Sequence, residues 1–297
     1  MAEHRAGFVT LLGKPNVGKS TLLNAIVGRK ISITSSKPQT TRHRILGVLT
    51  RESCQYIFVD TPGLHRASGR TINKIITRTT RSCLLGVDAI VLMITCGGWS
   101  EQDRYVLRSL EDVSVPVMLA INKIDRLKDK KKLLPLIDES SRLWKFEEII
   151  PLSATSGTNI EDLLSALGQI LPTGPMYFPE HQHTDRSSEF MISELIREQV
   201  FRLLGQELPY EAAVRVVSVS GENMPIIEAQ IWVDRESQKR MVVGKEGQRI
   251  KKIGINARKA IERVLEKQVY LDVVVKVRKG WADNQADLHS LGYIEER

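Results

Sequence analysis

The chain has 297 residues, of which 42% are hydrophobic, so its length and composition exclude a disordered chain and leave room for about two domains. Its formal net charge of +8 favours an anionic partner, such as nucleic acid or an anionic membrane surface, without choosing between them. The longest apolar run, Ala89 to Ile94, is far shorter than the ~18 residues that a spanning helix needs, so we expect any membrane contact to be peripheral.

The three cysteines, Cys54, Cys83 and Cys96, show neither a CxxC pair nor a metal-binding spacing. Cys54 and Cys96 lie in strand-like apolar runs, where we expect them to be buried small hydrophobic residues. The N-terminal apolar run is too short for a signal peptide. This usage suits a reducing compartment, and we therefore expect a cytoplasmic protein.

From residue 7 to about residue 171, strand-like apolar runs alternate with helix-like segments. The predicted strands are 7–12, 44–50, 54–60, 87–95, 115–121 and 149–153, and the predicted helices are 19–28, 70–85, 101–112, 129–145 and 159–171. This alternation predicts an α/β fold with a mostly parallel sheet and helices on both faces. Such folds bind ligands at the carboxyl ends of their strands.

The composition changes at 171–179, which holds three prolines and a glycine and indicates an extended connection. Beyond it the pattern predicts a second, α+β domain with helices at 188–204 and 248–266, strands at 212–220, 226–233 and 269–277, and a glycine-rich turn at 244–247. We assign 5–171 to the first domain, 172–187 to a linker, 188–280 to the second domain and 281–297 to a C-terminal tail.

A glycine-rich loop between the first predicted strand and the first predicted helix has the spacing GxxxxGK[ST]. Its residues are Gly13, Lys14, Pro15, Asn16, Val17, Gly18, Lys19 and Ser20, and Thr21 follows. Glycines let backbone N–H groups surround phosphates, and the positive N-terminal end of a helix stabilises the anion. In this pattern Lys19 reaches the outer phosphates and Ser20 places its hydroxyl on Mg²⁺. The position between a strand and a helix disfavours the alternative, an ordinary glycine-rich turn.

A second phosphate-site motif follows the third predicted strand. It comprises Asp60, Thr61, Pro62 and Gly63, followed by Leu64, and we assign all five to the nucleotide site. An aspartate at the end of a strand can hold Mg²⁺ through water, and the Gly63 N–H can approach the γ-phosphate. Between the two motifs lies the polar segment 33–43, where a threonine can ligate Mg²⁺ when the γ-phosphate is present. We favour Thr41 over Thr40, and assign catalytic roles to Lys19, Thr41 and Gly63.

The sequence Asn122-Lys123-Ile124-Asp125 predicts selection of guanine. The Asp125 carboxylate can accept hydrogen bonds from N1–H and the exocyclic amine of guanine, and adenine offers neither group at these positions. A site built on such buried polar groups rejects the wrong base by roughly 10⁴–10⁵. Ser153-Ala154, at the end of the last predicted strand, resembles the signature whose backbone N–H meets the guanine oxygen.

Together these motifs resemble those of the translation-factor-like GTPases, within the branch that includes Era. The resemblance implies GTP hydrolysis with Mg²⁺. Asn16 occupies the loop position at which related GTPases ligate K⁺, which implies stimulation by K⁺. Where many GTPases carry a glutamine that orients water, this chain has Leu64, so hydrolysis must use another group. The neighbouring His65 could act as the base, but we favour the simpler interpretation that it is an exposed histidine of a loop.

The second domain resembles a type-2 KH domain because its turn has the GXXG pattern and a basic amphipathic helix follows. Between Arg235 and Lys267 there are eleven Lys or Arg residues against four Glu. The resemblance implies that the loop clamps about four backbone nucleotides of single-stranded RNA. The RNA-binding residues that it implies are Gly244, Lys245, Glu246, Gly247, Gln248, Arg249, Lys251 and Lys252.

The combination resembles the Era-type GTPases with a C-terminal type-2 KH domain over nearly the whole chain. The match rests on segments 39–44, 60–65, 243–247, 280–283 and 290–293. The family implies a GTP-controlled factor that binds the 3′ end of 16S ribosomal RNA during assembly of the 30S ribosomal subunit. Its members can also associate peripherally with the inner membrane. Nothing in the sequence demands an oligomer, and we expect a monomer.

Two alternatives remain at this point. The first is an RNA-binding module whose nucleotide domain is only structural, but the intact Lys19, Ser20, Asp60 and Asp125 disfavour it. The second is a membrane-surface or cell-cycle regulatory GTPase in which RNA binding is secondary. It ranks lower because the sequence shows no amphipathic anchor helix and no lipidation motif.

Overall fold

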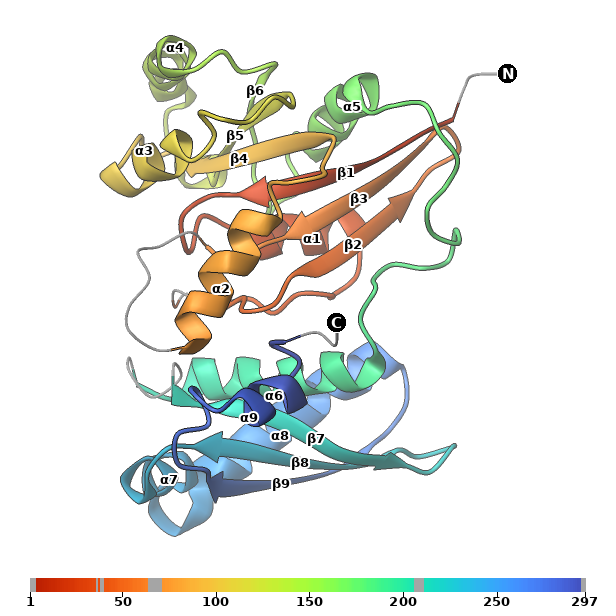
Figure 1. The fold of residues 1–297 in the computed structure, drawn as a ribbon, viewed down its shortest axis with the longest axis vertical. Coiled ribbons are helices and arrows are strands. Elements are labelled where there is room, and N and C mark those ends of the chain that lie inside the picture. Colours follow the sequence, from red (N-terminus) through yellow and green to blue (C-terminus); the bar gives the residue numbers. More distant parts are fainter. Residues whose placement is uncertain (1–3, 36, 38–39, 64–70, 206–210, 295–297) are drawn as a thin grey trace. The chain divides into compact units, whose positions relative to one another are not determined.

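The computed structural model describes residues 4–35, 37, 40–63, 71–205 and 211–294. It divides into two compact units (Figure 1). The first unit falls within 1–32, 41–66 and 77–185, and the second within 33–40, 67–76 and 186–297. The described residues of segments 33–40 and 71–76 therefore group with the second unit, although the sequence places them in the first domain. The limits of the domains, linker and tail stay a prediction.

The first unit is built on a six-stranded sheet in the order β2-β3-β1-β4-β5-β6. Only β2 runs antiparallel to its neighbour, so the predicted mostly parallel sheet is confirmed. The strands are β1 (Arg5–Leu12), β2 (Ile45–Thr50), β3 (Cys54–Asp60), β4 (Ala89–Thr95), β5 (Val117–Asn122) and β6 (Ile149–Pro151). Strands β3, β4 and β5 are mainly apolar and almost wholly buried, as expected of parallel strands covered on both faces.

Helices cover both faces of this sheet. Residues of α1 and α5 pack against one face and residues of α3 and α4 against the other. The helices of this unit are α1 (Lys19–Val27), α3 (Glu101–Arg108), α4 (Leu133–Leu143) and α5 (Ile160–Ile170), while α2 (Thr71–Ser82) is divided between the two units after Ile76. Two short 3₁₀ helices, η1 (Ile124–Arg126) and η2 (Lys130–Lys132), lie between β5 and α4. Because β1, β3 and β5 are parallel, the turns that follow them lie along one edge of the sheet.

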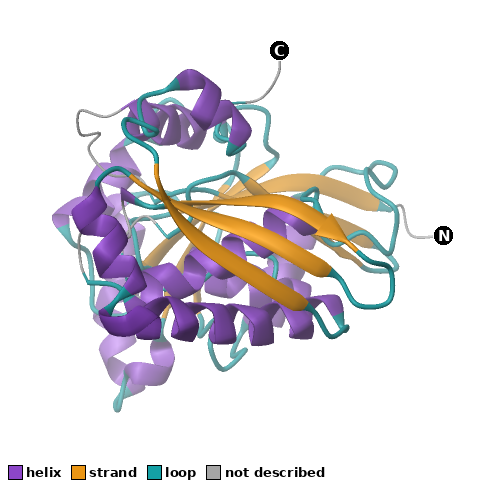
Figure 2. Ribbon diagram, turned by 90° about the horizontal axis from the view of Figure 1, so that it is seen from below, coloured by secondary structure: helices purple, strands orange, loops and turns teal. Residues whose placement is uncertain are grey.

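The second unit has a three-stranded sheet in the order β7-β8-β9 (Figure 2). β7 and β8 are antiparallel, and β8 and β9 are parallel. The elements are α6 (Ser188–Leu203), β7 (Ala213–Ser220), β8 (Ile226–Val233), α7 (Glu236–Val243), η4 (Lys245–Gly247), α8 (Gln248–Leu265), β9 (Tyr270–Val277) and α9 (Gln285–Ser290). Apolar residues of α6 and α8 pack with the sheet in one core.

Several elements differ from the prediction. The sequence does not predict α7, because this helix has little apolar periodicity. The start of α7 is fixed by the Gln238 side chain, which accepts from the backbone N–H groups of Asp234 and Arg235. α9 lies inside the predicted tail. Cys96 follows the end of β4 and is half-buried, with its thiol donating to the Lys123 carbonyl at 3.1 Å.

Among the described residues, no helix combines the length and apolar character that crossing a membrane requires.

Candidate guanine-nucleotide site and GXXG loop

The loop between β1 and α1 depends on glycine at points of close approach. Gly18 has φ 111°, and a Cβ there would lie 2.3 Å from the Asn122 Nδ2 atom. A Cβ on Gly63 would lie 2.8 Å from the backbone nitrogen of Pro15. No side chain fits at such distances, so glycine at these two positions lets the motifs that follow β1, β3 and β5 pack against one another.

Lys19, the first residue of α1, is buried and points back into this loop. Its Nζ donates to the carbonyl oxygens of Gly13 at 2.9 Å and Lys14 at 3.1 Å. Burial lowers the pKa of Lys19 to about 8, against the opposing effect of the nearby Asp60 carboxylate. The loop thus holds a buried cation. A bound phosphate group would offset the free-energy cost of removing this cation from water.

The side chain of Lys14 is tied to the start of α3. Its Nζ lies 2.7 Å from Asp103 Oδ2 and 2.9 Å from Ser100 Oγ. Asp103 is only 1% exposed and also accepts from the Ser100 backbone N–H and hydroxyl. Sequence reasoning missed this anchor, although the Ser-x-x-Asp capping pattern before an apolar helix could have indicated a buried carboxylate there.

Four oxygen-bearing side chains converge at the end of β3. Oδ2 of Asp60 accepts from the hydroxyls of Ser20 at 2.7 Å, Ser32 at 2.8 Å and Thr41 at 3.5 Å. The Ser20 and Thr41 hydroxyl oxygens are 2.8 Å apart. The neighbouring Thr40 hydroxyl instead donates to the Lys37 carbonyl at 2.7 Å. Sequence reasoning did not single out Ser32, which lies just before the polar segment 33–43 and belongs to no motif.

This cluster fits the requirements of a Mg²⁺ ion. Oδ1 of Asp60 is buried and has no hydrogen-bond partner among the described residues. Burial raises the pKa of the Asp60 carboxyl, while the Lys19 charge and the three hydroxyls oppose that shift. A buried carboxylate with one unused oxygen, next to the hydroxyls of Ser20, Ser32 and Thr41, is a set of hard oxygen donors of the kind that Mg²⁺ prefers.

The motif after β5 fixes the phosphate loop from outside. Asn122 Nδ2 donates to the Val17 carbonyl at 2.9 Å. Lys123, which adopts φ 68°, donates from Nζ to the Asn16 carbonyl at 2.6 Å. These bonds satisfy carbonyl groups on the outer side of the loop, so its shape is set before any nucleotide binds.

The last part of the site contains Asp125, whose side chain is exposed. Its Oδ1 accepts a 2.6 Å hydrogen bond from the Ser153 hydroxyl. The Ala154 N–H, which the sequence predicts to meet the guanine oxygen, donates to Asn122 Oδ1 at 3.0 Å in this structure. β5 and β6 thus bring Asn122, Asp125 and Ser153 together, as the order of the motifs predicts.

The remaining predicted nucleotide residues are placed as follows. Thr61 is fully buried and its hydroxyl donates to the Leu11 carbonyl at 2.9 Å, so this side chain supports the turn after β3. The Pro62 carbonyl accepts from the Thr80 hydroxyl at 3.2 Å. Leu64 and His65, like Gln39 in the preceding polar segment, lie outside the described residues.

The GXXG loop joins α7 to α8 and presents exposed basic side chains. Gly244 has φ 74°, and a Cβ there would lie 2.7 Å from the Arg249 Cβ. Arg249 donates from its guanidinium to the Met241 carbonyl, which ties the loop to α7. The exposed predicted RNA-binding residues are Lys245, Glu246, Gln248, Arg249, Lys251 and Lys252.

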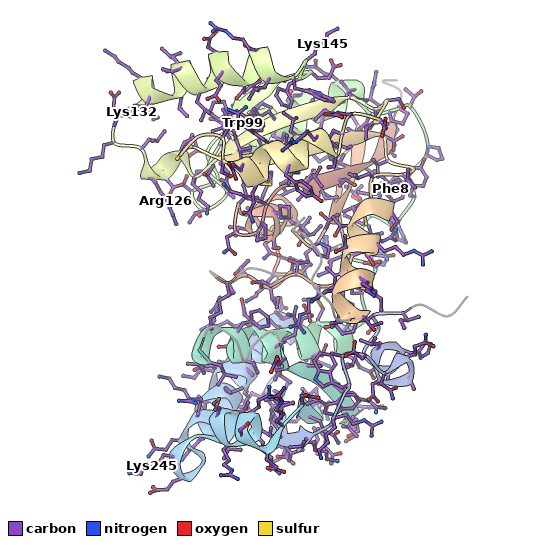
Figure 3. All side chains as sticks on the ribbon, turned by 60° about the vertical axis from the view of Figure 1, so that its left-hand side comes forward. Phe8, Trp99, Arg126, Lys132, Lys145 and Lys245 are labelled. Carbon is purple, nitrogen blue, oxygen red and sulfur yellow. The ribbon has the colours of Figure 1, made fainter. Side chains whose placement is uncertain are left out.

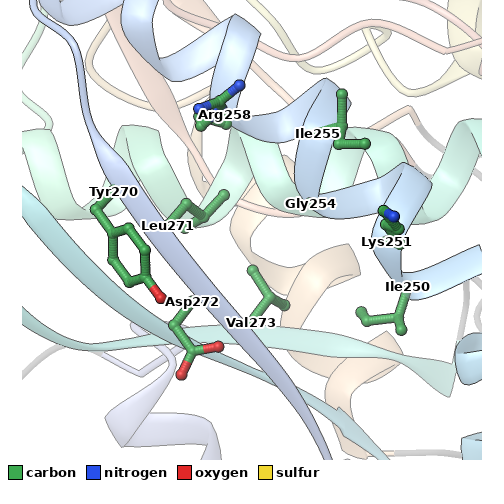
Figure 4. Close-up of a pocket in the computed structure, with 9 residues that line it drawn as sticks. All are labelled: Ile250, Lys251, Gly254, Ile255, Arg258, Tyr270, Leu271, Asp272 and Val273. Atoms are coloured by element: carbon green, nitrogen blue, oxygen red, sulfur yellow. The ribbon is translucent and has the colours of Figure 1, made fainter. Parts of the chain in front are cut away.

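A groove of about 370 Å³ lies between α8 and the edge strand β9, beyond the GXXG loop (Figure 4). It is lined by Ile250, Lys251, Gly254, Ile255 and Arg258 of α8 and by Tyr270, Leu271, Asp272 and Val273 of β9. Its walls combine apolar side chains with the cationic groups of Lys251 and Arg258 and the carboxylate of Asp272, a surface that offers a base both stacking and hydrogen-bonding partners. Sequence reasoning missed the β9 wall because strand pairing, and hence the free edge, is not visible in the sequence.

Comparisons with known proteins agree with this site. The model of the family described as a 50S ribosome-binding GTPase matches residues 8–123, and that of a KH domain matches 207–282. GTPase Era of Coxiella burnetii is 51% identical over 290 residues, covering 97% of this chain and 98% of that protein. GTPase Era of Xanthomonas oryzae pv. oryzae is 47% identical over 293 residues, covering 98% of each.

Two solved structures are similar along nearly the whole chain. One is a variant of Era from Aquifex aeolicus bound to GDP and AlF₄⁻, with a TM-score of 0.94, 37% identity, and coverage of 97% of this chain and 99% of that chain. The other is Era in complex with MgGDPNP and nucleotides 1506–1542 of 16S ribosomal RNA, with a TM-score of 0.94, 37% identity, and coverage of 98% and 99%. With both sets of motifs in place and half of its residues identical to those of GTPase Era over 97% of its length, the chain belongs to the Era family of GTPases.

Proposed function

We propose that the chain is a GTP-hydrolysing switch that binds the 3′ end of 16S ribosomal RNA through its KH domain and acts in assembly of the 30S subunit. The observation that carries this proposal is the presence, in one chain, of a guanine-nucleotide site and an exposed GXXG loop with an adjoining groove. The solved Era in complex with MgGDPNP and an RNA fragment supports it, because that relative combines the same two ligand classes.

In this proposal each predicted residue has one role at the nucleotide. Ser20 and Thr41 ligate Mg²⁺ directly, and Asp60 binds it through water. Mg²⁺ supplies charge neutralisation for the phosphates when it is bound. Lys19 turns its ammonium group from the loop carbonyls to the outer phosphates, and the Gly63 N–H donates to the γ-phosphate.

The base is selected at the opposite end of the site. Asp125 accepts from guanine N1–H and the exocyclic amine, with Ser153 holding the carboxylate in place. An adenine nucleotide would cover this carboxylate without offering it a donor, so the carboxylate would lose hydrogen bonds to water and gain none from the base. GTP and GDP are therefore the proposed ligands, and GTP is the substrate.

Hydrolysis needs a substitute for the water-orienting glutamine, because Leu64 offers no polar group. We propose that K⁺ beside Asn16 contributes charge stabilisation, and that a partner can supply more, since a missing charge-stabilising group is worth ~10³–10⁵ in rate. Equal GTPase rates in Na⁺ and K⁺ buffers of the same ionic strength would exclude the K⁺ role.

RNA binding is proposed at the GXXG loop and the first turn of α8. The glycines allow the sugar–phosphate chain to approach, and Lys245, Arg249, Lys251 and Lys252 provide the electrostatic part of the affinity. We propose that the protein works as a monomer in the cytoplasm. Any attachment to the inner face of the membrane would be peripheral, through its basic charge.

The test is GTP hydrolysis in K⁺ buffer with and without single-stranded RNA from the 3′ end of 16S ribosomal RNA. We expect RNA to raise the rate, and Gly244→Asp to abolish the rise. Gly174→Asp is the matched control, because it adds the same charge at a position where a Cβ meets nothing within 4 Å. RNA bound without stimulation would mean that the two sites act separately, and absence of RNA binding would refute the ribosomal role while leaving the GTPase intact.

A further inference from the structure

Five cationic side chains are gathered within seven residues of the first unit, between β5 and α4. This basic patch comprises Arg126, Lys128, Lys130, Lys131 and Lys132. All five are exposed, and none forms an ion pair with another residue that the structure describes. The one carboxylate in the run, Asp129, accepts from the Lys131 backbone N–H at 2.9 Å. With five cations against one carboxylate, the run carries half of the formal net charge of +8.

The fold gains nothing from this charge at this place. Lys130–Lys132 form η2, which leads directly into α4, and the N-cap position of α4 is Lys132. This N-cap makes no side-chain hydrogen bond, and the first turn of α4 has no acidic residue. Because the N-terminal end of a helix is already positive, cations there oppose helix formation. Sequences place cations at the start of a helix, against this preference, mainly where a function requires the charge there.

The surroundings of the basic patch favour a nucleic acid over a lipid surface. A helix that binds a membrane keeps an apolar face outside, but Leu133 and Leu136 of α4 are buried in the core of the first unit. The exposed apolar residues of this helix are the adjacent Leu134, at 68%, and Pro135, which together are too small to form an apolar face. An array of exposed cations without an apolar face suits the regularly spaced phosphates of an RNA backbone.

We propose that the basic patch is a second RNA-binding surface, which contacts backbone phosphates of folded ribosomal RNA without reading its sequence. The inference rests on the proposed function and adds a partner surface on the GTPase unit to the GXXG loop. Phosphate contacts of this kind fix orientation and speed up association, whereas base contacts specify the sequence. The basic patch would therefore matter for binding the 30S subunit and not for binding a short single strand.

The test compares two triple variants of the full chain. The patch variant carries Lys130→Gln, Lys131→Gln and Lys132→Gln. The control variant carries Arg29→Gln, Arg108→Gln and Lys145→Gln, which removes the same charge from three exposed, scattered positions of the same unit. Lys145 and Lys132 lie at opposite ends of α4 (Figure 3). Binding is measured over a range of salt concentrations, to 30S subunits and to a short single-stranded oligonucleotide from the 3′ end of 16S ribosomal RNA.

We expect the patch variant to bind 30S subunits at least tenfold more weakly. The steepness of its plot of log affinity against log salt concentration should fall by about 2–3, because each lost phosphate contact reduces this slope by ~0.7–0.9. Binding of the oligonucleotide should not change, and the control variant should resemble the wild type. The melting temperature of the patch variant should be no lower than that of the wild type, because the substitutions remove cations from a helix N-terminus.

Three outcomes would overturn the inference. Unchanged 30S binding would show that the lysines are only solvated, and equal losses in both triple variants would show a general charge effect. Loss of binding to phosphatidylglycerol vesicles with 30S binding retained would assign the basic patch to a membrane. If the wild type binds neither 30S subunits nor the oligonucleotide, the proposed function itself fails, so the two failures are distinguishable.

Discussion

The Ser153 hydroxyl donates a 2.6 Å hydrogen bond to Oδ1 of Asp125, across the gap between the ends of β5 and β6. Asp125 is exposed, and an exposed carboxylate would otherwise rotate freely. The bond therefore orients the guanine-reading group before the nucleotide arrives, which reduces the entropy lost on binding. Ser153 is fully buried, so its own position is set by the core.

Ser153→Ala tests this relationship. We expect GDP affinity to fall about tenfold, close to the lower end of the ~1.5–3 kcal/mol typical of hydrogen bonds to charged groups. Ser153→Thr, which keeps the hydroxyl, should retain most of the affinity, and the melting temperature serves as a check on folding. Titration with fluorescent GDP measures all three proteins, and equal affinities for the wild type and Ser153→Ala would contradict the role given to this hydroxyl.

Nucleotide affinity should depend on pH through Lys19. The pKa of Lys19 is about 8 in this structure, below its ordinary 10.5, because the side chain is buried. Above pH 8 the nucleotide-free protein has lost this proton, and phosphate binding must restore it. We expect the Kd of GDP to rise by up to tenfold per pH unit above about pH 8.

Guanosine is the matched ligand for this experiment, because it carries the same titrating base without phosphates. Its affinity should show no Lys19-dependent decline, and identical pH profiles for GDP and guanosine would refute the prediction.

The lowered pKa of Lys19 also makes the stability of the folded protein depend on pH. Between about pH 8 and 10.5 the unfolded chain binds the proton that the folded chain has lost, so the nucleotide-free protein gains up to about 1.4 kcal/mol of stability per pH unit.

Thr40 and Thr41 are adjacent but should respond differently to mutation. The Thr41 hydroxyl lies 2.8 Å from that of Ser20, whereas the Thr40 hydroxyl donates to the Lys37 carbonyl. We expect Thr41→Ala to remove the extra affinity that Mg²⁺ gives to a GTP analogue over GDP, and Thr40→Ala to leave it within about twofold. The measurement is the ratio of the two affinities with Mg²⁺ and with a chelator, and the prediction is wrong if Thr40→Ala causes the larger loss.

The parts of the fold that could be predicted are those in which one segment carries its own pattern. The apolar runs of β3 and β4, the glycine loop before α1, and the motifs after β3 and β5 all follow from local sequence. Their convergence follows from the parallel sheet, because the carboxyl ends of such strands share an edge.

The parts that could not be predicted depend on contacts between distant segments. Asp103 and Ser32 are polar residues whose importance comes from the partners that the fold brings to them, Lys14 and Asp60. α7 begins where the Gln238 side chain accepts from two backbone N–H groups, and its sequence has little apolar periodicity. The grouping of segment 33–40 with the second unit depends on buried charges of α6, which a sequence pattern would place on a solvated face.

One of these buried charges, Arg197 of α6, gives the last prediction. Its guanidinium donates to both carboxylate oxygens of Glu194, at 2.6 and 2.5 Å, and to the Thr40 carbonyl at 2.6 Å. The Arg197 and Glu194 side chains are 3% and 4% exposed. Removal of one partner from such a pair leaves a buried charge without compensation, which typically costs about 3–5 kcal/mol.

Arg197→Met should therefore lower the free energy of unfolding of the second unit by about 3–5 kcal/mol, measured by urea denaturation. The double variant Arg197→Met, Glu194→Met removes both charges and keeps the side-chain volume, so it should recover most of this loss. A double variant as unstable as the single one would show that the cost comes from the lost bond to the Thr40 carbonyl. In that case Arg197 stabilises the second unit mainly by holding segment 33–40, and its pairing with Glu194 matters little.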